Sequence, residues 1–215
     1  MGITGGQQMN WMDMTLTEFQ NSLGSKKPTP GGGTASAVAL GQSAGLVAMV
    51  ANLTIDNDKW QDGWKACEEA LVLANEVMTK SGELANKDSE AFDQVMACFK
   101  MPKSTDEDKL LRRDAIRNAT LYAAEIPYLT ATISLELLET MQDIVEDCNA
   151  NAISDVGVAA LLATAGCKGA LFNVEINLNS LPNNYGESMR KNVESINNKC
   201  RAISKKIMHV VKARM

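Results

Sequence analysis

Proline interrupts this 215-residue chain at only five positions, and the stretches between them are rich in Ala, Leu, Glu, Lys and Met. Proline ends or kinks helices, whereas these residues have high helix propensity. Aromatic residues, which favour strands, make up only 5% of the chain. We therefore expect an all-α, multi-helix bundle. The five prolines are Pro28, Pro30, Pro102, Pro127 and Pro182.

Apolar periodicity and helix-start patterns set the expected helix boundaries. Thr15 with Glu18, and Ser104 with Glu107, each have the spacing of a capping box. Pro127 falls within a continuous pattern, where it predicts a kink or a new helix start. The expected helices cover residues 15–23, 33–54, 61–99, 105–124, 127–147, 154–178 and 186–213.

The N-terminal residues have a composition of their own. The segment TGGQQM resembles a phage-derived leader peptide that is added to proteins for expression. It has neither the basic nor the apolar region of a secretory signal. We expect residues 1–12 to be such a tag or a disordered leader, and the alternative is a native N-terminus of similar composition. Residues 13–215 are expected to form a single helical domain, since no linker divides them.

Charge and residue counts exclude several classes of function. The 21 basic and 26 acidic side chains give a formal charge of −5, which argues against a nucleic-acid partner. The five cysteines form no CxxC pair, and this favours reduced thiols in a cytoplasmic protein. His209 is the single histidine. A catalytic Ser-His-Asp or Cys-His arrangement would have to include this residue. A His-rich zinc site cannot be assembled from one histidine, and we predict no bound metal.

Residues 28–55 contain no charged side chain and are long enough to span a membrane. Polar residues such as Gln42 and Asn52 lower the apolarity of this segment, and no other stretch resembles a clean span. We therefore expect a buried helix of a soluble protein, without a membrane partner. Small residues recur every four positions and form a ridge that permits close helix packing, for which a subunit interface is one natural use. The ridge residues are Gly33, Ala37, Gly41 and Gly45.

Three consecutive glycines, Gly31 to Gly33, lie just before this helix in the sequence PTPGGGT. A helix start leaves backbone N–H groups unpaired and carries the positive end of the helix dipole, which suits an anion or a polarised carbonyl. The pattern is neither a Walker loop nor a complete GxGxxG motif. The alternative is a flexible turn before the helix, because glycine commonly marks turns.

Asp88 lies in the middle of a predicted helix and is surrounded by its apolar positions, Leu84, Phe92 and Val95 among them. A carboxylate on or beside a buried stripe loses hydration, and this raises its pKa toward the working pH of an acid/base catalyst. The alternative is an aspartate at the edge of the stripe that pairs with a lysine.

A third unusual segment, residues 151–181, is rich in small and apolar residues. Ser154 and Asp155 have the residue types of a helix N-cap. Asn173 and Asn177 are four residues apart and therefore share one helix face. Buried amides must be hydrogen-bonded, so this pair either locks two helices together or presents donors and acceptors to a polar heterocycle.

Together, three segments resemble one family: PTPGGGTASAVALGQSAGLVAMVANLT, KDSEAFDQVMACFKMPK and NAISDVGVAALLATAGCKGALFNVEINL. They are similar to the cyclodeaminase/cyclohydrolase family of one-carbon folate enzymes. Its members include the C-terminal domain of formiminotransferase-cyclodeaminase and bacterial methenyltetrahydrofolate cyclohydrolases. The resemblance runs from about Thr15 to the C-terminus. It implies an all-helical homodimer with a folate site near the subunit interface.

The resemblance also implies roles for individual residues. Asp88 would be the catalytic acid/base carboxylate. Family members often have Gly-Lys-Lys and a tyrosine after the LT of the uncharged helix, whereas here Lys59 would supply the cation and Trp60 the aromatic ring. The residues expected to bind substrate are Pro30, Gly31, Gly32, Gly33, Thr34, Lys59, Ser154, Asp155, Asn173 and Asn177.

The function implied by the resemblance is that of a folate enzyme. It would hydrolyse 5,10-methenyltetrahydrofolate to 10-formyltetrahydrofolate, cyclise 5-formiminotetrahydrofolate to the methenyl form with release of ammonia, or do both. Either reaction needs one proton shuttle and no metal or further cofactor. The alternative is a non-catalytic dimeric helical protein that binds folate or serves only in assembly. The expected partners are the folate and a second copy of the chain, in the cytoplasm.

The C-terminal helix concentrates positive charge in a protein whose net charge is negative. One interpretation is a solvated face. The other is a patch near the site that holds the anionic glutamate tail of a folate by Coulomb attraction. The basic residues are Lys191, Lys199, Arg201, Lys205, Lys206, Lys212 and Arg214.

Overall fold

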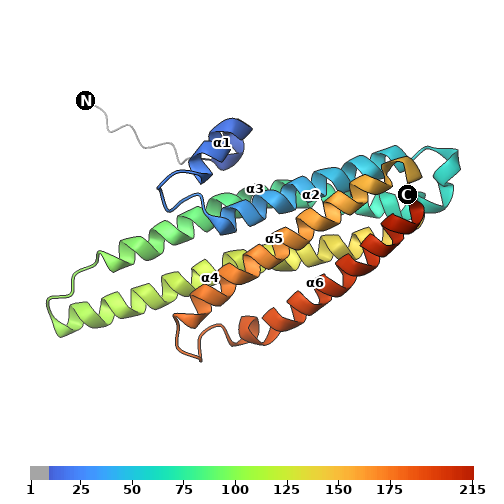
Figure 1. Ribbon diagram of the computed structural model, residues 1–215. Coiled ribbons are helices and arrows are strands. Elements are labelled where there is room, and N and C mark those ends of the chain that lie inside the picture. Colours follow the sequence, from blue (N-terminus) through green and yellow to red (C-terminus); the bar gives the residue numbers. More distant parts are fainter. Residues whose placement is uncertain (1–9) are drawn as a thin grey trace.

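The structure, a computed structural model, describes residues 10–215, and every regular element in that range is a helix. The long helices α2 to α6 lie side by side in an elongated bundle (Figure 1). The expected all-α class is therefore confirmed. The elements are η1 Trp11–Asp13, α1 Leu16–Leu23, α2 Gly32–Thr54, η2 Asp58–Gly63, α3 Trp64–Phe99, α4 Asp106–Ile144, η3 Ala150–Ala152, α5 Ile153–Asn179 and α6 Glu187–Arg214, where η marks a 3-10 helix.

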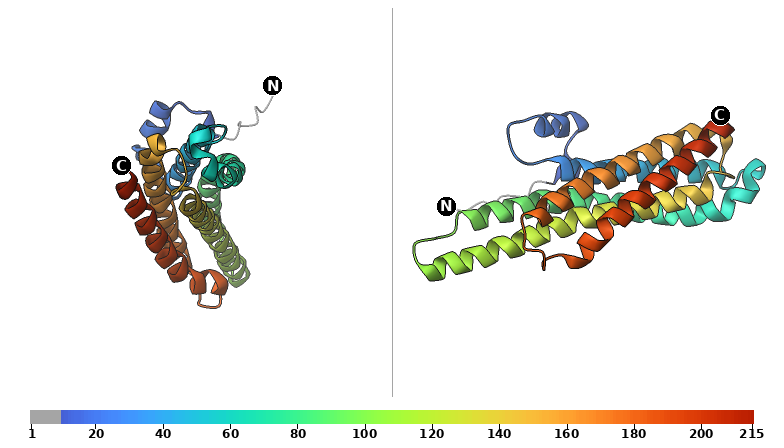
Figure 2. Two further views of the ribbon diagram at one scale, coloured as in Figure 1. Left: turned by 90° about the vertical axis from the view of Figure 1, so that its right-hand side faces the viewer. Right: turned by 60° about the horizontal axis from the view of Figure 1, so that its bottom comes forward.

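Successive long helices run in opposite directions and connect at the two ends of the bundle (Figure 1). α2 packs against α3 and α5, α4 packs against the same two helices, and α6 covers α4 and α5. α1 has no buried residue and stands apart from the bundle (Figure 2). The core between the long helices is filled by large, fully buried side chains, including Leu40, Leu84, Leu137, Leu138, Met141, Ile144 and Ile207.

Small side chains let α2 and α5 approach closely. The Ser43 Oγ donates a hydrogen bond to the Ala159 carbonyl oxygen of α5 at 2.8 Å. A Cβ atom added at Gly166 would come within 3.0 Å of the Ser36 carbonyl oxygen. The uncharged helix is thus a central, largely buried element of the bundle, as its sequence predicts.

Two helical segments of the described chain are long and apolar enough to cross a membrane, Gly32–Thr54 and Ala150–Asn179. In the bundle, 56% and 50% of their most apolar windows are buried. Only the first segment was expected from the sequence, because Asp155 and Lys168 interrupt the second. A core helix of a soluble protein meets the same criteria of length and apolarity.

The glycine ridge of α2 faces α3 of the same chain. Cβ atoms added at Gly33 and at Gly41 would collide with the side chains of Asp88 and Ser81, respectively. At Gly45 the nearest atom would be the Met78 Sδ, at 3.8 Å. The ridge therefore packs against α3 within the chain, and this contact takes the place of the subunit interface that was one suggested use.

Pro127 neither ends nor restarts a helix, so the predicted pair of helices at 105–124 and 127–147 is one helix, α4. Proline lacks the N–H group that would bond to the carbonyl four residues earlier, which is that of Ala123. The Asn177 Nδ2 donates a hydrogen bond to this carbonyl at 2.8 Å. A side chain of α5 thus supplies the missing donor at the point where the helix continues through Pro127.

Helix-start signals are confirmed at α1 and displaced by one residue at α4. Thr15 and Glu18 form the expected capping box. The box at α4 consists of Thr105 and Asp108 rather than Ser104 and Glu107. The two frames have the same spacing of Ser or Thr and acid, and the sequence alone does not separate them.

Of the expected leader, residues 1–9 lie outside the described residues. Asn10, Trp11 and Met12 do contact the bundle. The Trp11 backbone N–H donates to Asn86 Oδ1 at 2.9 Å, and Met12 packs on Gly82 of α3. These three residues therefore belong to the folded part of the chain.

Candidate active site

The N-terminus of α2 receives the Asp88 carboxylate from the neighbouring helix α3. The N-cap residue of α2 is Gly31, which has no side chain to satisfy the first N–H groups. The Thr34 Oγ1 donates a hydrogen bond to Asp88 Oδ2 at 3.0 Å, and the Thr34 backbone also interacts with this carboxylate. Asp88 thus occupies the position of a capping anion at the positive end of the α2 dipole.

The absence of a side chain at Gly33 makes this approach possible. A Cβ atom at this position would lie 2.6 Å from the Asp88 Cγ, inside the van der Waals distance. The glycine run therefore has a specific steric cause, and the alternative of a merely flexible turn is excluded for Gly33. Pro30 is buried just before the helix, and Thr34 is fully buried.

Two opposing effects act on the pKa of Asp88. Burial removes water from the carboxylate and raises its pKa, whereas the hydrogen bonds from Thr34 lower it, and burial is the larger effect. No Lys or Arg in the described part of the chain lies within 4.0 Å of Asp88, and the adjacent Lys87 pairs with Glu83 instead. The alternative of an aspartate paired with a lysine is therefore wrong.

A cavity of about 360 Å³ opens beside Asp88. Its walls come from the start of α2, from α3 and from α5, and no lining residue other than Asp88 is ionisable. Phe92, expected on the buried apolar face of α3, is instead 38% exposed, and it lines the cavity together with Phe99, which is 49% exposed. The lining residues are Pro28, Thr29, Gly31, Gly32, Gly33, Asp88, Phe92, Val95, Met96, Phe99, Ala123, Asn173, Ile176 and Asn177.

Asn173 and Asn177 both line the cavity, and each donates from its Nδ2. Asn173 bonds to the Gly169 carbonyl within α5 at 2.9 Å, whereas Asn177 reaches across to Ala123 of α4. Asn177 therefore does lock two helices together. In both amides the Oδ1 accepts no hydrogen bond from the described residues, so an acceptor remains free for a ligand.

The match to known proteins covers the whole of this site. The family model for formiminotransferase-cyclodeaminase matches residues 15–195. The chain belongs to this family. The matched range includes the start of α2, Asp88 on α3 and the two asparagines of α5.

Relatives in this family are similar along most of the chain. A methenyltetrahydrofolate cyclohydrolase from Methylorubrum extorquens is 34% identical over 203 residues, which cover 94% of this chain and 97% of that protein. A formimidoyltransferase-cyclodeaminase from Rattus norvegicus is 26% identical and covers 89% of this chain, which spans 36% of that protein. The crystal structure of a formiminotetrahydrofolate cyclodeaminase from Thermotoga maritima has a TM-score of 0.77 and 29% identity, covering 94% of this chain and 96% of that chain.

Three of the residues that the family resemblance assigned to the substrate lie at the other end of the bundle. Lys59 is an exposed residue of η2, beyond the C-terminus of α2, and this helix is about 34 Å long. Ser154 and Asp155 are in the first turn of α5, about 28 Å from Asn173 along that helix. Within one chain the structure does not bring these three residues to Asp88.

The predicted N-cap at Ser154 and Asp155 is also wrong. α5 follows directly on the short helix η3, so its N-cap position is Ala152. Asn149 caps η3 with its side chain, which accepts from the Asn151 N–H. The Asn149 Nδ2 also donates to the Leu53 carbonyl at the end of α2. The capping signal lies five residues before Ser154 because a 3-10 turn separates the cap from the long helix.

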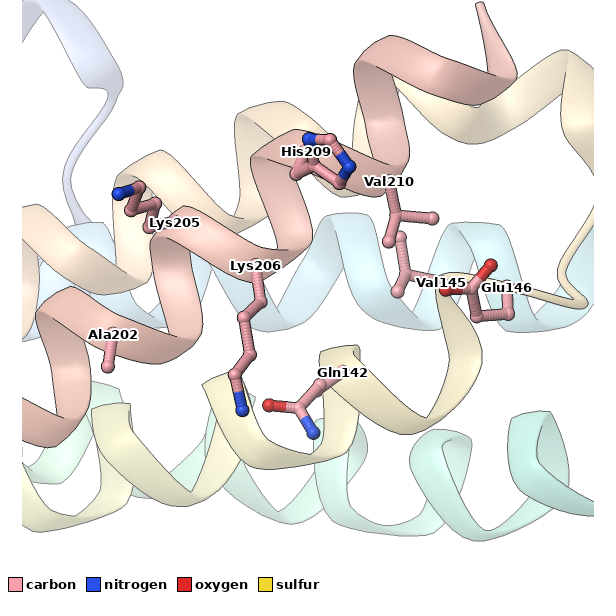
Figure 3. A pocket seen from close by; sticks show the side chains of 8 residues that line it. All are labelled: Gln142, Val145, Glu146, Ala202, Lys205, Lys206, His209 and Val210. Atoms are coloured by element: carbon pink, nitrogen blue, oxygen red, sulfur yellow. The ribbon is translucent and has the colours of Figure 1, made fainter.

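Four of the seven basic residues named on α6, Lys205, Lys206, Lys212 and Arg214, lie in its C-terminal part, at the end of the bundle that is remote from Asp88. Lys205, Lys206 and His209 line a hollow of about 760 Å³ together with Gln142 and Glu146. Figure 3 shows Lys206 directed toward Gln142, and Lys205 directed away from it. From Ala123 to Val145, which also lines this hollow, α4 rises about 33 Å. Within one chain, Lys205 and Lys206 therefore lie away from the site.

Arg214, another of these basic residues, has a structural role. Its guanidinium donates to the carbonyl oxygens of Val145 and Cys148 at 2.6 and 2.7 Å, and so satisfies backbone groups after α4. Among residues 10–215, no three His, Cys, Asp or Glu side chains come together in a way that could hold a metal ion.

Proposed function

We propose that this protein is a one-carbon folate enzyme that acts on the bridge between N5 and N10 of tetrahydrofolate. The observation that carries the proposal is the Asp88 carboxylate, which has no cationic partner among residues 10–215 and lies in a cavity lined by no other ionisable group of that range. One carboxylate with a raised pKa suits a single proton shuttle. The names of the relatives, both cyclohydrolase and cyclodeaminase, agree with this chemistry.

In the hydrolytic reaction, water adds to the carbon of the cationic 5,10-methenyl bridge. Asp88 takes a proton from the attacking water as the C–O bond forms. It returns this proton to N5 as the C–N5 bond breaks, the hydroxyl proton is lost to solvent, and 10-formyltetrahydrofolate results. The ionised carboxylate also attracts the methenyl cation, and this attraction is strong in a poorly hydrated site.

In the cyclisation, N10 attacks the formimino carbon of 5-formiminotetrahydrofolate. Asp88 receives the N10 proton and passes it to the formimino nitrogen. That nitrogen takes one further proton from solvent and leaves as ammonia, so that the 5,10-methenyl cation remains. The two reactions share the methenyl compound and one proton shuttle, and neither requires a further cofactor.

The cavity has the chemical character to hold a planar heterocycle. Phe92, Phe99 and Ile176 present apolar surface, and aromatic rings stack favourably on conjugated ring systems. The free Oδ1 atoms of Asn173 and Asn177 are acceptors for the N–H groups of such a ring. Pockets that combine an apolar wall with a few polar groups are typical of small-molecule sites.

We also propose that the protein is a cytoplasmic homodimer. Exposed apolar side chains follow α5 along its length and continue onto α2, and a soluble monomer rarely exposes such a surface. Lys59, Ser154 and Asp155 would then reach a bound folate only from the second copy. The exposed residues are Val158, Leu161, Phe172 and Ile176 on α5, and Met49 and Leu53 on α2.

A mixing experiment tests this shared site. Asp88→Asn and Asp155→Asn are purified as inactive proteins, unfolded together and refolded. If each site uses residues of both copies, random mixing restores about a quarter of the wild-type activity, because half of the dimers have one intact site. Sedimentation of Leu161→Arg should show a monomer. A monomeric wild-type protein contradicts the dimer.

Assays with both folates test the enzymatic function itself. Loss of the methenyl chromophore reports hydrolysis, and release of ammonia from 5-formiminotetrahydrofolate reports cyclisation. Turnover of either compound supports the proposal. The non-catalytic alternative predicts folate binding in calorimetry without turnover, or no binding at all. None of the named relatives favours that alternative.

A further inference from the structure

The segment before α1 is fastened to the same face of α3 that carries the site. The Asn86 Nδ2 donates to Asn10 Oδ1 at 2.7 Å while its Oδ1 accepts from the Trp11 backbone. Met12 packs so closely on Gly82 that a Cβ there would lie 2.9 Å from the Met12 Cγ. These contacts fix the indole ring of Trp11 near Ser89, the residue that follows Asp88 on α3.

A chain of hydrogen bonds runs from this indole to the carboxylate. The Trp11 Nε1 donates to the Ser89 Oγ at 3.0 Å. The Ser89 Oγ lies 3.0 Å from the Thr34 Oγ1, which donates to Asp88 Oδ2 at 3.0 Å. Both hydroxyl residues are buried, so water does not compete for these bonds.

The indole donor at one end of this hydrogen-bond chain and the carboxylate acceptor at the other allow a single direction of donation along it. An indole N–H only donates, so the Ser89 oxygen accepts and keeps its own hydrogen for Thr34. An ionised carboxylate only accepts, so the Thr34 hydroxyl donates its one hydrogen to Asp88 and must accept from Ser89. All three donors then point toward the carboxylate, and each bond polarises the next.

We propose that Trp11 is a positioning residue for Asp88, because its indole N–H fixes the direction of the Ser89 and Thr34 hydroxyls toward the carboxylate. This inference rests on the proposed function of Asp88. Trp11 does not line the cavity, so it acts through the two hydroxyls and makes no contact with substrate there. The chain stabilises the ionised carboxylate and opposes the effect of burial.

Few other charges face the carboxylate. The cavity side contains no further ionisable group. On the Trp11 side, the adjacent hollow is lined by Lys27 from the loop before α2 and by Glu90 and Asp93 of α3. These groups are unchanged when the indole N–H alone is removed, so that substitution isolates the hydrogen-bond chain.

Trp11→Phe removes the N–H and keeps an aromatic ring. We expect the pKa of Asp88, followed in the free protein by NMR of the side-chain carboxyl, to rise by about 0.3 to 1 unit. The same upward shift should appear in the pH dependence of kcat, with KM unchanged. Trp64→Phe is the matched control, because the Trp64 Nε1 donates to the Asn57 carbonyl at 3.2 Å, remote from the site.

Ser89→Ala breaks the chain at its next link and provides a second test. Its shift should equal or exceed that of Trp11→Phe, and the double variant should shift no further than Ser89→Ala, since both substitutions act through one path. An unchanged Asp88 pKa in Trp11→Phe, or additive shifts in the double variant, would overturn the inference. The NMR titration keeps this result separate from the proposed function, which fails if Asp88→Asn turns over normally.

Discussion

The Asn177 side chain donates to the carbonyl of Ala123, the group that Pro127 leaves without a partner in α4. A proline inside a helix and an asparagine fifty residues later are thus one structural unit. The same asparagine lines the cavity beside Asp88. Helix continuity and the wall of the candidate site therefore depend on the same hydrogen bond.

A double-mutant cycle tests this unit. Asn177→Ala leaves the Ala123 carbonyl unpaired and should lower the free energy of unfolding by about 1 to 3 kcal/mol. Pro127→Ala restores an N–H at the required position, so in that background the cost of Asn177→Ala should shrink by about 1 kcal/mol or more. Urea denaturation measures all four proteins. Additive free energies would show that the two residues are independent.

Replacement by alanine at two glycines of α2 should change the stability of the protein in opposite directions. At Gly33 the added Cβ overlaps the Asp88 carboxylate, so Gly33→Ala should cost about 1 to 3 kcal/mol of stability and most of the activity. At Gly45 the nearest atom is 3.8 Å away, and Gly45→Ala should gain about 0.5 to 1 kcal/mol from reduced backbone entropy. Thermal unfolding and turnover assays check both. Equal effects at the two positions contradict the steric account.

Asp88→Asn removes the titratable proton and keeps the shape of the side chain. Turnover should fall by about 10² to 10⁴-fold, which is the usual contribution of general acid–base catalysis. The fold should persist, because the amide oxygen can still accept from the Thr34 hydroxyl. Steady-state kinetics and circular dichroism provide the measurements. A folded variant with wild-type turnover removes Asp88 from the mechanism.

The raised pKa of Asp88 also predicts how stability depends on pH. The folded state holds the Asp88 proton more tightly than the unfolded state, whose value is near 3.8. The stabilising contribution of the protonated group is fully present below 3.8 and is lost as the pH rises through the raised folded pKa. Asp88→Asn does not titrate, so its stability relative to wild type should increase across that range.

Asp108 supplies the control of opposite sign. Hydrogen bonds with the Thr105 backbone and side chain lower its folded pKa below 3.8. Its contribution is present above 3.8 and is lost as the pH falls through the folded pKa. Asp108→Asn should therefore be less stable than wild type at neutral pH and approach it in acid. Unfolding measured from pH 2 to pH 8 compares the two variants. If the stability of the two variants relative to wild type changes with pH in the same direction, the raised pKa of Asp88 is refuted.

Truncating an apolar side chain in the cavity wall should weaken substrate binding without changing the stability of the fold. Phe92 is 38% exposed beside the cavity, and Phe92→Ala should raise KM by about two- to tenfold through lost stacking on the heterocycle. Val72→Ala is the control, because Val72 is exposed on the same helix and does not line the cavity. An unchanged KM in Phe92→Ala places the heterocycle elsewhere.

Local signals in the sequence determined the helical class, most helix boundaries and the burial of the uncharged helix. Helix propensity, capping boxes and apolar periodicity act over a few residues, so the sequence contains them directly. The nearby sequence also identifies the glycine run as a candidate part of the site by its residue type, and Asp88 by its position on an apolar helix face. Their proximity was expected only through the resemblance to a family.

The tertiary structure decided which distant groups meet. Nothing near Pro127 in the sequence indicates that Asn177 restores its missing hydrogen bond, and the proline alone favours a helix break. Lys59 follows the helix that begins at the glycine run, and Asp155 begins the helix that contains Asn173 and Asn177, yet the length of these helices places both residues at the opposite end of the bundle. Long-range pairing depends on how rigid helices pack, and that arrangement is set by the whole core rather than by any one segment.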